Sequence, residues 1–243
     1  MCYNHFVRKM VAVIPAYEPD ARLPQLIRRL ETVFNRFVVV NDGSRSARSV
    51  FDALRADSRV TVLVHDKNRG KGAALKTAFA ETHRRFPDAT GIITADADGQ
   101  HLPDDIIRVA RALLEDSGRP VVGVRTFGHD IPFRSKLGNL WTAAEFRLLT
   151  GRAIQDTQTG LRGIPFALIP RLLDIPGDRY DFEIRMLVWL ALRSEGVRQV
   201  PIRTIYEPGN GTSHFRPLTD TISTQRALIA EAVIGRFGGR SRA

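Results

Sequence analysis

Two aspartates stand two residues apart at the end of an apolar stretch, in the segment Thr94-Ala95-Asp96-Ala97-Asp98-Gly99-Gln100-His101. Side chains alternate along a strand, so Asp96 and Asp98 point the same way as a strand over residues 91–93 runs out. Adjacent carboxylates repel each other unless a cation lies between them. Gln100 adds a neutral oxygen on the same alternation, so three hard oxygens could serve Mg²⁺ or Mn²⁺. The alternative is a solvated acidic turn, because so short a motif also arises by chance.

Further residues with chemical potential follow other apolar stretches. Tyr17 and Glu18 follow residues 11–15, and Asp42 follows residues 37–40. An aromatic ring can stack on a nucleobase and two acids can accept its N–H groups, while a metal at the paired aspartates would hold the diphosphate. The alternative for Asp42 is an ordinary turn, because Asp, Gly and Ser dominate turns for backbone reasons.

The glycine-bearing segment Asn68-Arg69-Gly70-Lys71-Gly72 invites a phosphate-loop interpretation but has the wrong spacing for one. No glycine precedes Gly70 at the interval of a P-loop, and Leu75 stands where G-x-G-x-x-G needs its last glycine. We expect these small residues to let a helix begin close under neighbouring loops. An EF-hand at the paired aspartates is also excluded, because Ile107 occupies the twelfth position.

The elements that position these residues alternate between strand and helix. Apolar runs and helical spacing predict strands at 11–15, 37–40, 60–64, 91–93 and 121–124, with helices at 23–34, 50–54, 71–85 and from 102 onward. This order predicts an α/β fold with a doubly wound, mostly parallel sheet flanked by helices in a single domain. Such a sheet places its ligand site at the carboxyl ends of its strands.

The second half is less regular. It predicts a helix at 134–149, a loop or short strand at 156–163, a buried helix at 182–192, a strand at 197–206 and an amphipathic helix at 222–237.

Charge and composition narrow the partners. The chain of 243 residues carries 36 Lys and Arg against 26 Asp and Glu, which gives a formal net charge of +10. This charge favours phosphates, nucleic acid or an anionic membrane surface. The lone Cys2 excludes an intrachain disulfide and fits a reducing compartment. No apolar stretch approaches the ~20 residues that a membrane span needs. One alternative is a non-catalytic basic module that binds nucleotides or RNA, although aromatics are sparse and no RNP1 block is evident.

Four motifs, each after an expected strand, resemble family 2 glycosyltransferases of the GT-A fold: Val13-Ile14-Pro15-Ala16-Tyr17, Asn41-Asp42-Gly43-Ser44, Asn68-Arg69-Gly70-Lys71-Gly72 and Asp96-Ala97-Asp98-Gly99-Gln100-His101. Three later blocks resemble the branch of dolichol-phosphate mannose synthases and bacterial polyprenyl-phosphate glycosyltransferases: Val122-Gly123-Val124-Arg125, residues 156–162 and Thr212-Ser213-His214-Phe215. The resemblance implies an inverting, metal-dependent transfer of a sugar from a nucleoside-diphosphate sugar to a polyprenyl phosphate.

The resemblance also implies roles for individual residues. Those implied for the donor nucleotide are Pro15, Ala16, Tyr17, Glu18, Val40, Asp42, Asp96 and Ala97. The metal would be held by Asp96, Asp98 and Gln100, and the catalytic residues would be Asp98, Arg125 and Asp156. Those expected around the acceptor phosphate are Arg134, Ser135, Arg162, Ser213, His214 and Arg216. A phosphate acceptor is already anionic near neutral pH, so catalysis would need charge neutralisation rather than a strong base.

Some positions depart from this branch. Pro208 and His214 stand where its acceptor loop carries cations, with Arg216 nearby. The family's Arg before a Ser in the helix after the fifth strand is out of register, because Arg134 directly adjoins Ser135. Asp156 has three open roles: a base, an organiser of the acceptor phosphate through Arg162, or a loop cap. The alternative enzyme would act on a polysaccharide or small-molecule hydroxyl, with Asp156 or Glu183 as its base.

The expected organisation has three parts. Residues 1–10 form an N-terminal extension, residues 11–215 the catalytic domain, and residues 216–243 an amphipathic helix with a basic tail. This helix could lie on an anionic leaflet or pack on the core, and the pattern fits both uses. The expected location is cytoplasmic or peripheral on the inner face of the cell membrane. No nucleic-acid partner is expected, and both UDP and GDP donors fit the motifs.

Overall fold

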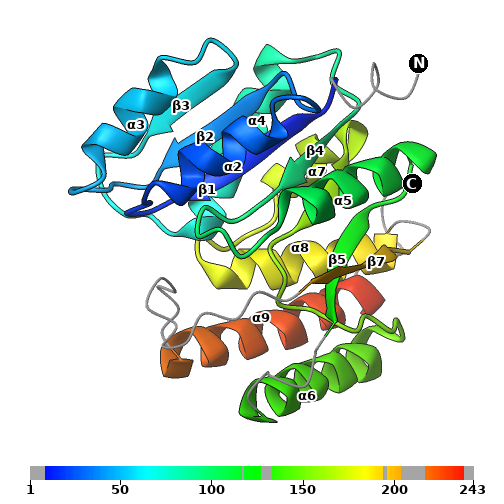
Figure 1. The fold of residues 1–243 in the computed structure, drawn as a ribbon. Coiled ribbons are helices and arrows are strands. Elements are labelled where there is room, and N and C mark those ends of the chain that lie inside the picture. Colours follow the sequence, from blue (N-terminus) through cyan, green and yellow to red (C-terminus); the bar gives the residue numbers. More distant parts are fainter. Residues whose placement is uncertain (1–8, 117, 127–132, 194–195, 204–216, 238–243) are drawn as a thin grey trace.

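The computed structural model describes residues 9–116, 118–126, 133–193, 196–203 and 217–237, with the backbone alone at 133–139, 193, 217–222 and 235–237. Within this part, seven strands pair into one sheet in the order β3-β2-β1-β4-β6-β5-β7 (Figure 1). The strands are β1 (Val11–Ala16), β2 (Phe37–Asn41), β3 (Val60–Val64), β4 (Gly91–Thr94), β5 (Val121–Thr126), β6 (Arg162–Pro165) and β7 (Arg198–Arg203).

Helices connect and cover these strands. They are α2 (Arg22–Leu30), α3 (Arg48–Arg55), α4 (Lys71–Arg85), α5 (Pro103–Glu115), α6 (Phe133–Thr150), the 3₁₀ turn η1 (Phe166–Leu168), α7 (Ile169–Leu173), α8 (Tyr180–Arg193) and α9 (Pro217–Phe237). Side chains alternate along β1 between the two faces of the sheet, and helices cover both faces. Ala12 and Ile14 pack with α2, α3 and α5, whereas Val11 and Val13 pack with α4, α7 and α8. The predicted single-domain, doubly wound α/β fold is confirmed.

Strand direction brings the motifs to one edge. β1, β2, β3 and β4 are parallel neighbours, so the residues that follow them meet at their shared carboxyl edge. β6 runs antiparallel to β4 and β5, and its first residue, Arg162, pairs with Thr94 at the end of β4. The polar segment before β6 therefore returns to the edge that carries the paired aspartates.

Two glycines let α4 begin against the loop that precedes α8. Gly70 has φ +106°, and a Cβ there would lie 2.4 Å from the carbonyl oxygen of Asp178. A Cβ on Gly72 would lie 2.5 Å from the Cβ of Phe182. The Asp178 carbonyl accepts the N–H of Ala73 at 2.9 Å, which satisfies one donor of the helix start. The small residues of this segment thus allow close packing, as their pattern predicted.

The domain limits differ slightly from expectation. Met10, the last residue of the expected N-terminal extension, is fully buried in the apolar cluster that includes residues of α2 and α5. At the other end, α9 packs on α8, and Arg185 of α8 lies 3.3 Å from Glu231 of α9 (Nη1 to Oε2). A third apolar cluster unites α6, α8 and α9 around Phe146 and Leu228. The C-terminal helix is therefore packed on the domain along one of its sides.

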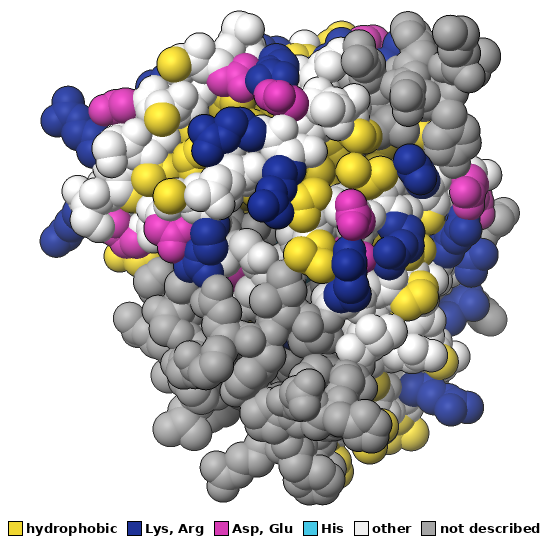
Figure 2. Space-filling view, viewed as in Figure 1, with side chains coloured by type: hydrophobic (Ala, Val, Ile, Leu, Met, Phe, Trp, Pro, Cys, Tyr) yellow, Lys and Arg dark blue, Asp and Glu magenta, His cyan; other side chains and the backbone are white. Residues whose placement is uncertain are grey.

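Basic side chains are dispersed over the face seen in Figure 2. Lys and Arg lie there among Asp and Glu rather than in one continuous stripe. Several surface arginines have acidic partners, such as Arg36 with Asp88 at 2.9 Å and Arg59 with Asp57 at 2.7 Å. Among the described residues of this face, positive side chains are therefore interspersed with negative ones.

Candidate active site

The paired aspartates follow β4, whose end is tied on two sides. The Thr94 hydroxyl donates to the carbonyl of Gly160 at 2.6 Å, and the N–H of Ala95 donates to the carbonyl of Val13 at 3.0 Å. His101 Nδ1 accepts the N–H of Asp96 at 3.0 Å, which closes the turn after the strand. Because Nδ1 is an acceptor, the proton of a neutral His101 is on Nε2, which lies 3.8 Å from Asp96 Oδ2.

Asp96 is held as a carboxylate by neighbouring positive charge. Lys71 Nζ lies 2.7 Å from Asp96 Oδ1. Burial opposes ionisation, but the charge of Lys71 and its hydrogen bond outweigh it and lower the pKa of Asp96 to about 2. Gly160 packs directly on this carboxylate, since a Cβ there would lie 2.6 Å from Asp96 Oδ2.

Asp98 has the opposite environment. Its Oδ1 accepts the N–H of Gln100 at 3.0 Å. Burial raises the pKa of Asp98, and the negative charge of Asp96 raises it further. The pKa of Asp96 is thus lowered and the pKa of Asp98 is raised. The positive charge present stabilises one carboxylate but not both, so a further cation would bind favourably beside Asp98.

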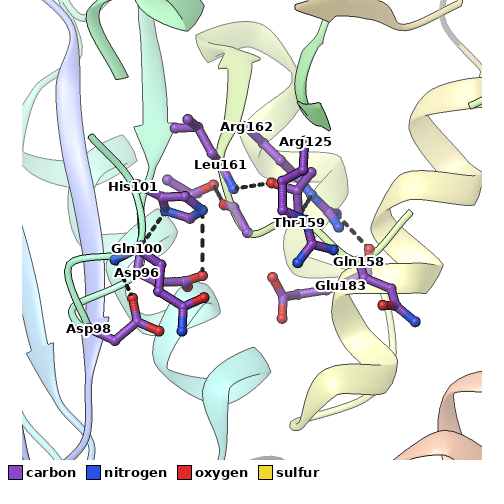
Figure 3. Close-up of polar contacts among 12 residues, drawn as sticks. Asp96, Asp98, Gln100, His101, Arg125, Gln158, Thr159, Leu161, Arg162 and Glu183 are labelled. Atoms are coloured by element: carbon purple, nitrogen blue, oxygen red, sulfur yellow. Dashed lines mark hydrogen bonds and ion pairs between the residues drawn. The ribbon is translucent and has the colours of Figure 1, made fainter. Parts of the chain in front are cut away.

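Lys71 and Glu183 complete the acidic side of the site. Lys71 Nζ lies 3.1 Å from Glu183 Oε1, so one ammonium bridges Asp96 after β4 and Glu183 on α8. Burial would lower the pKa of Lys71, but the two carboxylates raise it, so it stays charged. Figure 3 shows the carboxylates of Asp96 and Glu183 directed into the same space. Sequence reasoning did not assign Lys71 to the site; the lysine within its glycine-bearing segment was the available signal.

Arg125 and Asp156 form a two-point ion pair. Arg125 Nε and Nη2 donate to the Asp156 carboxylate at 2.6 and 3.0 Å, and the N–H of Gln158 also donates to it at 3.1 Å. Asp156 is 0% exposed, whereas Arg125 is half-buried. Burial opposes the charge on Arg125, but its bond to Asp156 raises its pKa. Of the three roles left open for Asp156, that of an organiser would act through Arg125, which is the arginine hydrogen-bonded to it, rather than through Arg162.

Arg162 lies beneath the site. It is 1% exposed, and it donates to the carbonyl oxygens of Thr159 at 3.2 Å and Glu183 at 2.6 Å. Burial lowers its pKa, opposed by the charges of Glu183 and Asp96. Arg162 therefore supplies positive charge from below, and its contact with an acceptor phosphate stays a prediction.

The loops after β1 and β2 are joined through Glu18. Its carboxylate accepts the N–H of Arg45 at 2.6 Å and also binds the N–H and hydroxyl of Ser46. The bond from the Ser46 hydroxyl is the main cause of the lowered pKa of Glu18. In return, Ser44 Oγ accepts the N–H of Glu18 at 2.8 Å. Tyr17 stands half-buried beside this junction.

The other predicted nucleotide residues occupy the same edge. Pro15 and Ala16 are buried at the end of β1, and the side chain of Val40 is buried in the core under β2. Ala97 is half-buried between the paired aspartates. Asp42 is 4% exposed and accepts the N–H groups of the loop before α4. The assignment of these residues to the nucleotide stays a prediction, and Asp42 has a structural task as well.

A divalent cation suits the donor set by chemistry. Asp96, Asp98 and Gln100 offer hard oxygens, and the raised pKa of Asp98 marks a charge deficit that a cation would relieve. Within the described residues, no group of three or more His, Cys, Asp or Glu is arranged to hold a metal ion. A metal here would take its remaining ligands from elsewhere, such as the oxygens of a bound diphosphate.

Several residues predicted to lie near the acceptor phosphate are described by their backbone alone or are not described. Arg134 and Ser135 belong to the first turn of α6, where the backbone alone is described. Ser213, His214 and Arg216, with Pro208, lie outside the described residues.

A mostly parallel α/β sheet with paired aspartates at its carboxyl edge is typical of GT-A glycosyltransferases. Residues 11–172 match the family model of glycosyl transferase family 2. The chain belongs to this family, as its motifs indicated, and it is a glycosyltransferase.

Curated relatives act on lipid phosphates by name. The chain is 28% identical over 214 residues to the UDP-N-acetylglucosamine–dolichyl-phosphate N-acetylglucosaminyltransferase of Methanococcus voltae, covering 80% of this chain and 84% of that one. It is 33% identical over 181 residues to the undecaprenyl-phosphate 4-deoxy-4-formamido-L-arabinose transferase of Salmonella newport, covering 69% of this chain and 52% of the relative.

The fold is shared with a solved enzyme. Glucosyl-3-phosphoglycerate synthase from Mycobacterium tuberculosis, in complex with Mn²⁺, UDP and glucosyl-3-phosphoglycerate, superposes with a TM-score of 0.67 at 19% identity. The match covers 94% of this chain and 80% of that chain. The same enzyme with Mn²⁺, UDP-glucose and phosphoglyceric acid gives a TM-score of 0.68.

Proposed function

We propose that the protein transfers a sugar from a nucleoside-diphosphate sugar to a polyprenyl phosphate, with inversion at the anomeric carbon and with Mg²⁺ or Mn²⁺ bound at Asp96 and Asp98. The names of the Methanococcus and Salmonella relatives support the lipid-phosphate acceptor. The loops after β1, β2 and β4 meet at the carboxyl edge of the sheet, where open α/β sheets bind their ligands, and this supports a nucleotide donor. We assign the catalytic unit to residues 11–215, with α9 packed on it.

One observation carries the choice of acceptor. A hydroxyl acceptor needs a base that can reach its proton, and Asp156 and Glu183 are the two candidates. Asp156 is fully buried with both oxygens bound by Arg125, and Glu183 Oε1 is bound by Lys71. Both carboxylates thus serve to hold cations. A phosphate acceptor needs no such base, because it is already an anion at neutral pH.

The chemistry is a single displacement. An oxygen of the lipid phosphate forms the new bond to the anomeric carbon, the bond to the donor diphosphate breaks, and the nucleoside diphosphate leaves. Attack opposite the leaving group inverts the configuration. Arg125, oriented by Asp156, presents a planar guanidinium suited to two-point phosphate binding. When bound, the metal would neutralise charge on the diphosphate.

A thermal-shift screen tests the donor half of this proposal. UDP- and GDP-sugars are added with and without Mn²⁺, because a ligand that binds only the folded state raises its melting temperature. We expect one nucleoside-diphosphate sugar to raise it by several degrees with Mn²⁺ and far less without. The absence of a shift with every donor would contradict the proposal.

The end of the molecule formed by α6 and α9 fits a membrane surface. These helices contact each other, and they expose large apolar side chains: Leu140, Trp141, Leu148, Ile229, Val233 and Ile234. Trp141 and Leu148 are 71% and 76% exposed and lie two turns apart on α6. Arg147 and Arg226 are exposed on the same two helices. Within the described residues, no helix is both long and apolar enough to cross a bilayer.

We therefore place the protein peripherally on an anionic leaflet through α6 and α9. Trp141→Ser with Leu148→Ser should weaken the affinity for vesicles of anionic lipid by about thirtyfold or more in a cosedimentation assay, since each exposed apolar side chain contributes roughly 1–2 kcal/mol on insertion. Val64→Ser is the matched control, because Val64 is 54% exposed on β3 at the far edge of the sheet. Equal cosedimentation of all three proteins would remove this surface from the proposal.

A further inference from the structure

Three side chains form a chain of hydrogen bonds outside the catalytic residues, with His65 and Asp42 buried and Thr77 half-buried. His65 follows β3, and its Nδ1 lies 2.7 Å from Oδ1 of Asp42, which follows β2. Its Nε2 lies 3.0 Å from the hydroxyl of Thr77, one and a half turns into α4. The side chains of His65 and Asp42 are each 5% exposed. Thr77 and His65 have no role in the chemistry proposed above, whereas Asp42 is also predicted to contact the donor nucleotide.

The donors and acceptors of this chain are fixed by its members. The Asp42 carboxylate already accepts the N–H of Arg69 at 2.9 Å and the N–H of Gly70 at 2.8 Å. A carboxylate only accepts, so His65 Nδ1 carries a proton and donates it. In the neutral ring Nε2 then accepts, and the Thr77 hydroxyl donates to it. Thr77 thereby orients His65, and His65 orients Asp42.

Asp42 in turn fixes the residues that lead into the active site. Gly70 directly precedes Lys71, and its φ of +106° and close approach to Asp178 leave this turn little freedom. The bond from Gly70 to Asp42 Oδ2 sets where α4 begins. Lys71 is the first residue of α4. The ammonium of Lys71 lies 2.7 Å from Asp96 and 3.1 Å from Glu183, so it must contact both carboxylates at once. A small shift of the turn would break one of these two contacts.

We propose that His65, held by Thr77, is a positioning residue that acts through Asp42 and the backbone of Gly70 to place Lys71 between Asp96 and Glu183. The link to catalysis rests on the proposed function, whereas the placement of Lys71 is a property of the free protein. A purely structural role would instead stabilise the whole domain without a specific effect on Lys71.

Matched threonine variants separate these roles. Thr77→Val removes the hydroxyl that holds His65 and keeps the side-chain shape, and Thr77→Ser restores a hydroxyl. Thr82→Val is the control on the same helix, because Thr82 is fully buried and its hydroxyl has no hydrogen-bond partner within the described part of the chain.

Amide hydrogen exchange of the ligand-free protein tests the positioning directly. We expect the amides of Arg69 and Gly70 to exchange about tenfold faster in Thr77→Val, near the wild-type rate in Thr77→Ser, and unchanged in Thr82→Val. Unchanged exchange at these two amides, or an equal acceleration across the whole domain, would overturn the proposal.

A double-mutant cycle tests the link to Lys71. The dissociation constant of UDP or GDP is measured with Mn²⁺. Thr77→Val should weaken binding about tenfold in the wild-type background but less than about twofold alongside Lys71→Met, because coupled residues are not additive. Losses that multiply in the double variant would show that Thr77 does not act through Lys71. If the wild type binds neither nucleotide, the proposed function fails, and amide exchange alone then decides the positioning role.

Discussion

At the scale of single residues, the site gives opposite pKa shifts to two aspartates that the sequence pattern does not distinguish. Lys71 holds Asp96 in its ionised form, whereas Asp98 has a raised pKa because it is buried next to that charge. On the other side, Asp156 holds Arg125. Each side of the candidate site thus contains an ion pair that fixes the orientation of one charged group.

Asp98→Asn should stabilise the ligand-free protein while removing metal-dependent donor binding. The pKa of Asp98 is higher in the folded protein than in the unfolded chain, so the protonated carboxyl favours folding. Its contribution to the free energy of unfolding is fully present below the pKa of the unfolded chain and is lost as the pH rises through the pKa of the folded state. The variant should therefore melt higher than wild type at pH 7, and the two melting temperatures should converge near pH 3. A lower melting temperature at pH 7, or retained metal-dependent binding, would contradict this assignment.

Arg125→Lys should lower kcat/KM by about 10²-fold although the charge is kept. A lysine offers a point charge in place of the two-point contact that Arg125 makes with Asp156 and would make with phosphate. The matched control is Arg36→Lys, which replaces another two-point pair, with Asp88, on the exposed surface. Steady-state kinetics with wild-type turnover in Arg125→Lys would show that Arg125 does not contact a substrate.

Candidate site residues that belong to local patterns could be predicted from the sequence, whereas contacts between distant residues could not. The spacing of Asp96 and Asp98 after an apolar run was enough to place them at a strand end. Lys71 and Glu183 are more than a hundred residues apart, and no local pattern indicates that one ammonium would bridge Asp96 and Glu183. The choice of Arg125 over Arg162 as the partner of Asp156 depends in the same way on how β5 and β6 pair.

At the scale of elements, the start of α4 matters most because it delivers Lys71. The predicted helix at 71–85 has the same limits as α4, since its apolar spacing and small first residues are local signals. β6 was predicted only as a loop or short strand ending at 163. It spans four residues with Gly163 and Pro165 among them, so its pairing with β4 and β5, rather than its own propensity, makes it a strand.

Gly72→Ala should destabilise the protein by about 1–3 kcal/mol, because a Cβ there would overpack against Phe182 and the carbonyl of Arg179. Alanine is otherwise the better helix former, so a surface site would show the opposite sign. Gly118→Ala is the control, since a Cβ there meets nothing within 4 Å. If chemical denaturation gave Gly72→Ala a free energy of unfolding equal to or higher than that of wild type, the close packing of α4 on the loop before α8 would not be needed for stability.

At the scale of the whole molecule, the catalytic edge and the proposed membrane face are joined by one helix. α8 carries Glu183 into the site, and α9 packs along it, tied by Arg185 and Glu231. α9 buries Ala227, Leu228 and Ala232 and exposes Ile229 and Val233. The helix therefore packs on the core with one side and leaves the other free for a lipid surface, so the two uses weighed from its sequence are compatible.

The acceptor is the central claim, and one measurement tests it most directly. The enzyme receives the donor identified by thermal shift, Mn²⁺, and either a short-chain polyprenyl phosphate or the alcohol of the same chain. The account predicts sugar transfer to the phosphate and none to the alcohol, because the site holds Arg125 for an anion and keeps Asp156 and Glu183 bound to cations. Transfer to the alcohol, or donor hydrolysis without transfer to either lipid, would contradict it.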